Sequence, residues 1–442
     1  MIRTPRNRQG QQQNRWRTLS SNDKANQAVS MPTINPSRMK AVFDGINAFG
    51  RNSDTGGFNR IGFSDADMAA RRWLADYMES EGLAVSWDAA GNCFGRFGDG
   101  DSPSVMAGSH TDTVPEGGAF DGTLGVAVAL ECALAIRDSG IPLAHPIEVV
   151  NTAEEEGRFG GMLGSQTITG QVDPRWLDEA SDPDGFRLWD AMERQGLDPS
   201  HIASAARTPG SLKAFLELHV EQGPVLERAS VSAGIADCVS GVINLSVMLE
   251  GAANHSGTTP MELRADAFAG LAEAAAAISA LIEAQGTSQS RVTIGKVELQ
   301  PNFPHTIPGR AEFSVIIRDT DADVMRALED GFRDRVEHAA HRHGLHLAVR
   351  EHSRLAPIAL DAALVQLLRD VADGSGIGTM TMPSGAGHDA QTMQAICPSG
   401  LIFVPSRGGI SHAPEEWTDW NDACAGAKVM LAAMVRLARD AS

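Results

Sequence analysis

Hydrophobic positions along the chain recur at two spacings, one typical of helices and one of strands. The helical spacing covers residues 65–82, where Gly82 is expected to end the helix, and residues 124–138. Short apolar runs predict strands at 104–110, 146–157 and 212–223. Because strands alternate with helices here, the pattern predicts an α/β fold with a mostly parallel sheet. Functional sites in such sheets lie beyond the carboxyl ends of the strands.

The middle of the chain has a different order of elements. Its strand-like runs are 241–251, 291–299, 310–319 and 345–352, and the helical stretches 261–285 and 321–343 lie among them. The resulting order, strand–helix–strand–strand–helix–strand, is that of a ferredoxin-like split βαβ unit. We therefore expect an inserted α+β domain at 236–352. The surrounding domain is formed by 31–235 and 353–442, and it closes with a strand at 401–406 and a helix at 416–439.

Residues 1–30 differ in composition from the rest. They contain five Arg and one Lys against one Asp, together with runs of Gln and Asn and almost no apolar periodicity. This composition predicts a disordered basic tail. Two alternatives stay open: a transit peptide, although no amphipathic stripe supports it, and a translation start assigned upstream of Met31.

Charge and cysteine content restrict the class of protein. The 442 residues carry a formal net charge of −19, to which the tail contributes +5 and residues 31–442 contribute −24. So acidic a chain is not expected to bind nucleic acid, which needs a basic surface. No apolar run approaches the roughly 18–20 residues that span a bilayer, so a membrane protein is not expected either. The five scattered cysteines, without a CxxC pair, favour a reducing compartment and hence a cytoplasmic location.

Residue types that bind metal ions follow the predicted strands. They are His110 and Asp112 in GSHTDT, Asp121 in GGAFDG, Glu154, Glu155 and Glu156 in AEEEG, His219 in ELHVEQG, and His412 in GGISHAPEE. Each alone is a weak signal, since a lone histidine or an acidic run is usually ordinary polar surface. Their shared position after apolar strands, flanked by glycines that let the backbone approach a ligand, favours a metal site. Histidine and carboxylate ligands without cysteine suit zinc, manganese or cobalt.

Such a set can hold two divalent ions about 3.5–4 Å apart, which need a shared carboxylate and two further ligands each. Asp121 can bridge the ions, with His110 and His412, or a second Glu and His219, completing the two sides. One remaining acid is then free to take a proton from a water molecule, and Asp112 can orient the His110 ring. Spacing alone does not decide which acid has which role.

Six segments resemble the signature blocks of one family of binuclear metal amidohydrolases. They are GSHTDTVPEGGAFDGTLGV, TAEEEGRFGGMLGS, FLELHVEQGPVLE, GAANHSGTTPM, PSGAGHDAQTM and FVPSRGGISHAPEEW. The family includes N-carbamoyl-L-amino-acid hydrolases, β-ureidopropionases and allantoate amidohydrolases, and it is related to the di-zinc aminopeptidases. The resemblance runs in order from about residue 36 to residue 438, so the basic tail lies outside it.

The resemblance implies a role for each candidate metal ligand. It places His110 and His412 on one ion and Glu156 and His219 on the other, with Asp121 as the bridge. It also implies that Glu155, the acid before the metal-binding glutamate, is the general base. Asp112 matches the position that orients the first histidine.

The resemblance further implies contacts to the substrate. Gln222 matches a residue near the substrate, Arg318 matches an arginine that binds the substrate carboxylate, and Gly387 matches a backbone contact to the same carboxylate. His255 matches a histidine that reaches across a dimer interface and helps to polarise the scissile carbonyl. His305, in PNFPHTIPG, stands where the family usually has Asn. This departure leaves the exact substrate open, because imidazole and amide differ as hydrogen-bonding groups.

These matches predict a metal-dependent hydrolase that cleaves a C–N bond of a small anionic carbamoyl or ureido acid. The expected cofactor is two divalent ions per subunit, zinc first, with manganese, cobalt or nickel as alternatives. The expected assembly is a homodimer formed through the inserted domain, which also closes over the catalytic domain as a lid. An aminopeptidase or N-acyl amino acid hydrolase of the related di-zinc branch is the alternative. A non-catalytic small-molecule binding protein is a remote third, against which Glu155 argues because binding alone needs no general base.

Overall fold

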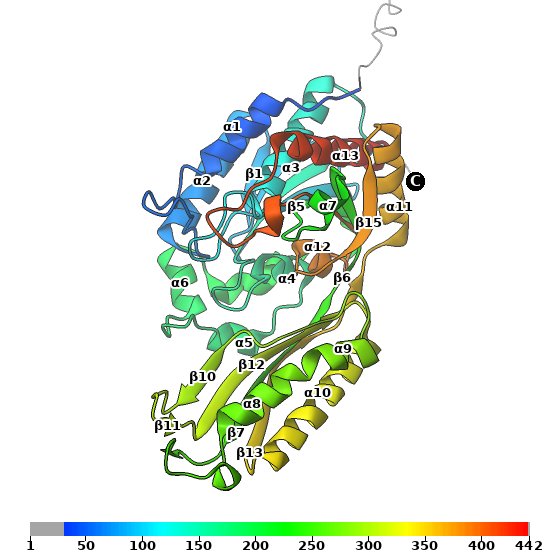
Figure 1. Ribbon diagram of the computed structural model, residues 1–442. Coiled ribbons are helices and arrows are strands. Elements are labelled where there is room, and N and C mark those ends of the chain that lie inside the picture. The colour runs from blue at the N-terminus through cyan, green and yellow to red at the C-terminus, as the bar shows by residue number, and fades with distance from the viewer. Residues whose placement is uncertain (1–30, 441–442) are drawn as a thin grey trace, which may run out of the picture.

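The computed structural model describes residues 31–440, so the predicted basic tail lies outside the described residues. Two β-sheets of different size lie one beyond the other, the larger in the upper half of Figure 1 and the smaller in the lower half. Each sheet has its own hydrophobic core, and a third, smaller core lies beside the larger sheet within residues 63–205. The fold is therefore mixed α/β, with the central sheet and the smaller sheet packed separately.

Within residues 31–440 the larger sheet has nine strands, and its centre is parallel. The order is β1-β2-β4-β3-β5-β16-β6-β14, and β15 also pairs with β6. The strands are β1 (Ala84–Trp87), β2 (Cys93–Phe97), β3 (Ser104–His110), β4 (Ile147–Thr152), β5 (Leu212–Val220), β6 (Ala233–Val239), β14 (Ile358–Ala359), β15 (Thr379–Ser384) and β16 (Ser399–Val404). β4, β3, β5 and β16 run parallel. The predicted parallel sheet is confirmed for this centre, whereas the pairs β1–β2, β2–β4, β6–β16 and β6–β14 are antiparallel.

Helices cover both faces of the larger sheet. α3 (Thr123–Ser139), α11 (Ala362–Gly374) and α13 (Trp420–Arg439) pack on one face, and α4 (Leu163–Thr169) and α12 (Asp389–Met393) pack on the other. α1 (Pro36–Ile46) contacts α3, and α2 (Asp65–Ser80) packs on β1 and β2. The remaining elements around this sheet are α5 (Pro174–Glu179), α6 (Leu188–Arg194), α7 (Val225–Ala229) and the 3-10 turns η1 (Pro199–Ala205) and η3 (Arg407–Gly409). α3 is buried over most of its length because its sequence is apolar on every side.

The smaller sheet is antiparallel, in the order β10-β12-β7-β13 with β9 paired to β12. Its strands are β7 (Gly241–Glu250), β9 (Arg291–Thr293), β10 (Val297–Gln300), β12 (Arg310–Asp319) and β13 (His346–Leu355). The helices α8 (Ala267–Ala276), α9 (Ile278–Gln285) and α10 (Ala322–Arg342) cover one face, as Figure 1 shows. This order of strands and helices is the one that the sequence pattern predicts. The run 291–299, predicted as one strand, is two strands, because Lys296 leaves the regular ladder and its N–H donates to the Ser314 hydroxyl at 3.0 Å.

Two chain segments connect the sheets side by side. In the first segment, β6 of the larger sheet ends at Val239 and β7 of the smaller sheet begins at Gly241. In the second, β13 of the smaller sheet ends at Leu355, and the chain returns to the larger sheet as β14, which pairs with β6 at Val239. A Cβ atom on Gly241 would lie 2.7 Å from the carbonyl oxygen of Leu355, so glycine permits this close crossing. The crossing places the end of the smaller sheet next to strand ends of the larger one.

The stretch Ala267–Gln285 is, by length and composition, apolar enough to cross a membrane. The prediction that no segment reaches this length is therefore wrong for this stretch, whose apolar character comes mostly from alanines. The structure divides it into α8 and α9, and its buried residues Leu271 and Leu281 belong to the core of the smaller sheet.

Candidate metal centre

The candidate metal ligands meet where the central parallel strands end. His110 is the last residue of β3, and it lies opposite Thr152, the last residue of β4. The acids of residues 154–156 follow β4 directly, and His219 lies near the end of β5. Because parallel neighbours end at the same edge of a sheet, this register brings side chains that are distant in sequence to one site.

Asp121 stands between two clusters of possible ligand atoms. In the first, ligand atoms of His110, Asp121 and His219 all lie within 4.8 Å of one another, and in the second those of Asp121, Glu156 and His412 do. The Nε2 atoms of His110 and His219 lie 3.4 and 3.0 Å from Oδ1 of Asp121. The Nε2 atom of His412 lies 3.4 Å from Oδ2. The two oxygens of Asp121 therefore face different clusters.

This grouping corrects one expectation about the ligands. The resemblance paired His110 with His412 and Glu156 with His219. In the structure His110 lies with His219, and Oε2 of Glu156 is 3.5 Å from Nε2 of His412. The physical reason is strand order: β3 and β5 are adjacent, so their histidines share one side of Asp121.

The histidine rings are oriented so that Nε2 faces Asp121. Nδ1 of His110 is 3.0 Å from the carbonyl oxygen of Asp112, and Nδ1 of His219 is 2.8 Å from that of Val220. A carbonyl oxygen only accepts, so each Nδ1 carries a proton, and in the neutral ring each Nε2 then keeps its lone pair. A lone pair aimed at a carboxylate oxygen is unfavourable unless a cation lies between them. The donor set therefore fits a divalent metal ion.

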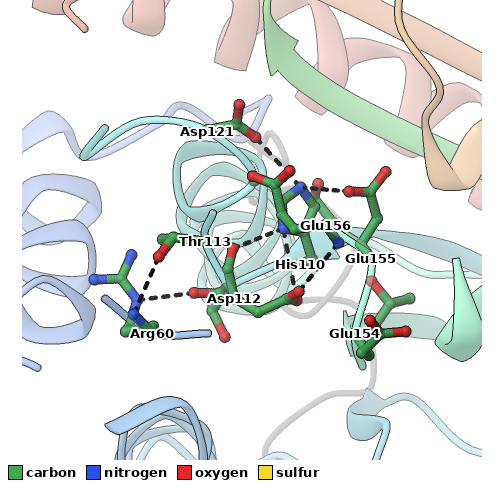
Figure 2. A network of polar contacts seen from close by, with 12 residues as sticks. Arg60, His110, Asp112, Thr113, Asp121, Glu154, Glu155 and Glu156 are labelled. Atoms are coloured by element: carbon green, nitrogen blue, oxygen red, sulfur yellow. Dashed lines mark hydrogen bonds and ion pairs between the residues drawn. The ribbon is translucent and has the colours of Figure 1, made fainter. Parts of the chain in front are cut away.

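Three consecutive glutamates after β4 have separate environments (Figure 2). Oε2 of Glu155 lies 3.5 Å from Nε2 of His110. Glu154 lies apart and accepts N–H groups of the following loop at 2.7 and 3.3 Å. Burial raises the pKa of Glu154 and of Glu156 to about 8, and that of Glu155 well above its usual value. Burial of so many acids is unfavourable for the charged forms, and a bound cation would offset this cost.

Asp112 contacts His110 through its main chain. Its carboxylate oxygen Oδ1 lies 3.7 Å from Nδ1 of His110, too far for a hydrogen bond, whereas its carbonyl oxygen lies at 3.0 Å. The carboxylate instead accepts the N–H of Glu156 at 3.1 Å and lies 3.4 Å from the guanidinium of buried Arg71. Asp112 is therefore in contact with His110, and the contact is made by its main-chain carbonyl oxygen.

Two buried arginines that the sequence pattern does not single out hold the ends of β3 and β4. Arg60 donates from Nε to the carbonyl oxygen of Thr111 at 2.8 Å, within the network that Figure 2 shows. Arg71 donates from Nη2 to the carbonyl oxygen of Thr152 at 2.6 Å. Both side chains are fully buried. No local sequence signal identifies them, because an arginine in a polar segment is normally exposed.

Gln222 directly contacts residues of the two ligand clusters. Its Nε2 donates to Oδ2 of Asp121 at 2.8 Å and lies 3.2 Å from Nε2 of His412. Its Oε1 is buried and has no hydrogen-bond partner among the described residues. An acceptor left unpaired beside the ligands is the kind of group that a substrate or ion satisfies.

Arg318 and Gly387 share a cavity with the glutamates. Glu155, Glu156, Gly387 and Arg318 all line a cavity of ≈ 520 Å³ between the two sheets. Arg318, near the end of β12, donates from Nη1 to the carbonyl oxygen of Gly385 at 3.0 Å. Burial alone lowers its pKa, so no acid in the described part of the chain compensates its charge.

His255 and His305 lie away from this cavity. Both are exposed at the far end of the smaller sheet, in and beside the short pair β8 (Asn254–His255) and β11 (Thr306–Ile307), of which Figure 1 labels β11. Neither lines the cavity that contains Glu155 and Arg318. Within one chain, the structure therefore does not bring these two predicted residues to the metal centre.

Glu416 is a positioning residue that the sequence reading missed. Its Oε1 accepts the N–H groups of Phe120 and Asp121, each at 2.9 Å. Its Oε2 accepts the hydroxyl of Ser411 at 2.6 Å, and Ser411 precedes His412. Glu416 therefore ties the loop of Asp121 to the loop of His412. The signal was available in SHAPEEW, where an acid follows His412 by four residues.

Replacing Glu416 by alanine is expected to weaken metal binding by about 10–100-fold, because both ligand loops lose their shared anchor. Isothermal titration of the metal-free protein with zinc would measure this change. The matched control is Glu415→Ala, which removes an exposed acid from the adjacent position and should leave metal affinity unchanged. Equal affinities for the two variants would contradict the positioning role.

Histidine and carboxylate side chains gathered at the strand ends of a sheet with a parallel centre form a set that can hold divalent metal ions. The sequence profile of peptidase family M20/M25/M40 matches residues 106–436. The chain belongs to this family.

Two relatives of the chain carry amidohydrolase names, and one similar solved structure carries an amidase name. An N-carbamoyl-L-amino acid amidohydrolase of Geobacillus stearothermophilus is 38% identical over 391 residues, covering 87% of this chain and 94% of that protein. An allantoate amidohydrolase of Bacillus subtilis is 33% identical over 396 residues, covering 88% and 95%. The crystal structure of a hydantoinase/carbamoylase family amidase from Burkholderia multivorans has a TM-score of 0.85 at 31% identity, covering 93% of this chain and 99% of that one.

Proposed function

We propose that the protein is a metal-dependent amidohydrolase that cleaves a non-peptide C–N bond of a carbamoyl or ureido acid. The observation that carries this proposal is one cavity lined both by Glu155 and Glu156 and by Arg318, whose pKa is shifted by burial alone. A small acid fits this arrangement, with its carboxylate at Arg318 and its carbamoyl group at the metal centre. The names of the relatives supply the class of scissile bond.

The five metal ligands in this proposal are His110, Asp121, Glu156, His219 and His412. We propose two ions, zinc first, because the two clusters share Asp121 and each adds one histidine and one further ligand. Such ions, when bound, lower the pKa of a coordinated water and polarise the carbonyl that it attacks.

Glu155 is the general base in this proposal. Its carboxylate is within the cavity and 3.5 Å from His110, yet it belongs to neither ligand cluster. It is therefore free to remove a proton from the attacking water and to deliver that proton to the leaving nitrogen. Arg318 and Gly387 hold the substrate carboxylate, and Gln222 offers its unpaired Oε1 to a substrate N–H group.

A hydrolysis screen tests the function. Protein loaded with zinc, manganese or cobalt is assayed for ammonia release from N-carbamoyl-L-amino acids, β-ureidopropionate, allantoate and ureidoglycolate, and for cleavage of short peptides. We expect turnover of at least one carbamoyl or ureido acid. Turnover of peptides alone would favour the aminopeptidase alternative, and no turnover with bound metal would refute the proposal.

We further propose that His255 acts on the active site of a second subunit. Its Nδ1 accepts the N–H groups of Gly257 and Thr258 at 3.0 and 3.3 Å, so its proton lies on Nε2, ready to donate to a carbonyl oxygen. The same end of the smaller sheet exposes Met261 and Phe303, at 74% and 60% of their surface. Exposed apolar side chains of this kind favour a protein interface.

Mixing two inactive variants tests this assembly. His255→Ala and Glu155→Gln are each expected to be inactive, but a hybrid dimer holds one site with Glu155 from one chain and His255 from the other. The two variants are mixed in equal amounts and either refolded together or left to exchange subunits. Half of the dimers are then hybrids, and each hybrid has one intact site of two, so the mixture should recover about a quarter of the wild-type rate. A mixture that stays inactive would place His255 in its own chain's site or outside catalysis.

A further inference from the structure

Arg318 has a second arginine beside it on the sheet. In the antiparallel pair of β9 and β12, Arg291 lies directly opposite Arg318. Directly opposite residues project from the same face, with Cβ atoms about 4.5–5.5 Å apart. Their neighbours Val292 and Ile317 belong to the core under the helices, so the two arginines occupy the uncovered face. Like charges in this position destabilise a sheet unless an anion lies between them.

Neither guanidinium has a carboxylate partner within residues 31–440. Nη1 of Arg291 donates to the carbonyl oxygens of Ser288 and Ser290 at 2.9 and 2.8 Å. Nη1 of Arg318 donates to the carbonyl oxygen of Gly385. These contacts to neutral carbonyl oxygens orient the two guanidinium groups. They leave the positive charges without a counter-ion, and the N–H groups of each Nη2 can donate to another acceptor.

Both arginines line a second cavity, of ≈ 480 Å³, which adjoins the first. The two cavities share Ser240 and Arg318, and the second is also lined by Gln222, which contacts the ligand clusters. Its lining also includes the apolar side chains Met380 and Met382. The cavity therefore combines apolar side chains with two cations.

The acid that lines this cavity is already engaged. Glu221 accepts the N–H groups of Val225 and Leu226 at 2.7 and 2.8 Å through its two oxygens. Its carboxylate is therefore held at the N-terminus of α7 and forms no ion pair with Arg291 or Arg318 within residues 31–440. An anionic ligand bound between the two arginines would compensate their charge.

The strand that carries Arg291 is held in place by the residue after Arg318. Asp319 is buried and accepts the hydroxyl of Thr287 at 2.8 Å, and it also accepts the hydroxyl of Ser290. The turn before Arg291 is therefore anchored to β12, which fixes the spacing of the two arginines. Such preorganisation reduces the entropic cost of binding an anion.

The geometry points to a subsite for a second anionic group, so the preferred substrates are carbamoyl derivatives of dicarboxylic acids. The α-carboxylate binds Arg318, the distal carboxylate binds Arg291, and the methylene groups between them lie against Met380 and Met382. This inference rests on the proposed function and narrows its substrate class from a monoanion to a dianion.

Isosteric substrate pairs test the subsite. The rate constant kcat/KM is measured for N-carbamoyl-L-aspartate against N-carbamoyl-L-asparagine, and for the glutamate and glutamine pair. The wild-type enzyme is expected to prefer the acid by about tenfold, the size of one charge-assisted hydrogen bond. Arg291→Met should abolish this preference while leaving kcat/KM for the amide unchanged, and Arg291→Lys should retain part of it.

The matched control is Arg350→Met. Arg350 is an exposed arginine of β13 that lines a different cavity on the same sheet, so its removal should not change the acid-to-amide ratio. A wild-type ratio near one, or a ratio unchanged by Arg291→Met, overturns the subsite while the proposed function stands. If none of the four derivatives is hydrolysed, calorimetric titration with succinate and butyrate decides the subsite separately. Tighter binding of succinate that is lost in Arg291→Met supports it, and equal binding overturns it.

Discussion

Replacing Glu155 by glutamine is expected to lower kcat by about 10²–10⁴-fold while the metal content stays unchanged. Glutamine keeps the volume and one carbonyl oxygen of the side chain but cannot accept a proton. Because Glu155 lies outside both ligand clusters, its replacement removes no metal ligand. Steady-state kinetics on the best carbamoyl substrate, together with elemental analysis of the purified variant, would measure both quantities.

The neighbouring acid supplies the matched control for Glu155. Glu154 is buried in the same run, but it points to the N–H groups of the following loop, apart from the clusters (Figure 2). Glutamine keeps the size of this side chain and can still accept the N–H of Phe159 through its carbonyl oxygen, so only the longer contact to the N–H of Gly161 is lost. Glu154→Gln should therefore retain most of the activity. A Glu155→Gln variant with full activity and normal metal content would remove Glu155 from the role of base.

Replacing Asp121 by alanine is expected to have the largest effect on metal binding. Asp121 is the residue that the two clusters have in common, and each of its oxygens faces a different cluster. Its loss should reduce the metal content from about two ions per chain to near zero. Activity should be lost with the metal, and elemental analysis after dialysis against zinc buffer would measure the occupancy.

Replacing His412 by alanine shows whether a ligand of one cluster has a smaller effect than Asp121, which belongs to both. His412 belongs only to the cluster with Glu156, so its loss should spare the cluster of His110 and His219. We expect this variant to retain about one ion per chain. If Asp121→Ala also retained one ion, the shared role of Asp121 would be refuted.

Much of the architecture follows from local patterns in the sequence. β3 begins and ends where the apolar run SVMAGSH does, and β12 likewise matches the predicted run 310–319. β4 ends at Thr152, five residues before the end of the predicted run 146–157, because the chain leaves the sheet before the acids of residues 154–156. Hydrophobic periodicity therefore locates the strands, since each strand must bury its own side chains, but it extends this strand too far.

Contacts between distant segments were not predictable in the same way. Glu416 and Asp121 lie 295 residues apart, and their hydrogen bond depends on how two loops pack. Arg60 and Arg71 are buried although arginine is usually exposed, because their guanidinium groups satisfy carbonyl oxygens at strand ends. Each of these contacts needs a partner that no local pattern names.

The sequence by itself determined the order of elements, the placement of histidines and acids after apolar strands, and the identity of Asp121, Glu155 and Arg318 as candidates. Tertiary structure alone decided which ligands share a cluster, because this depends on β3 lying next to β5. It also decided that Asp112 contacts His110 through a carbonyl oxygen. The physical reason is that a strand's own burial pattern is local, whereas sheet order and register are set by packing between segments far apart in the chain.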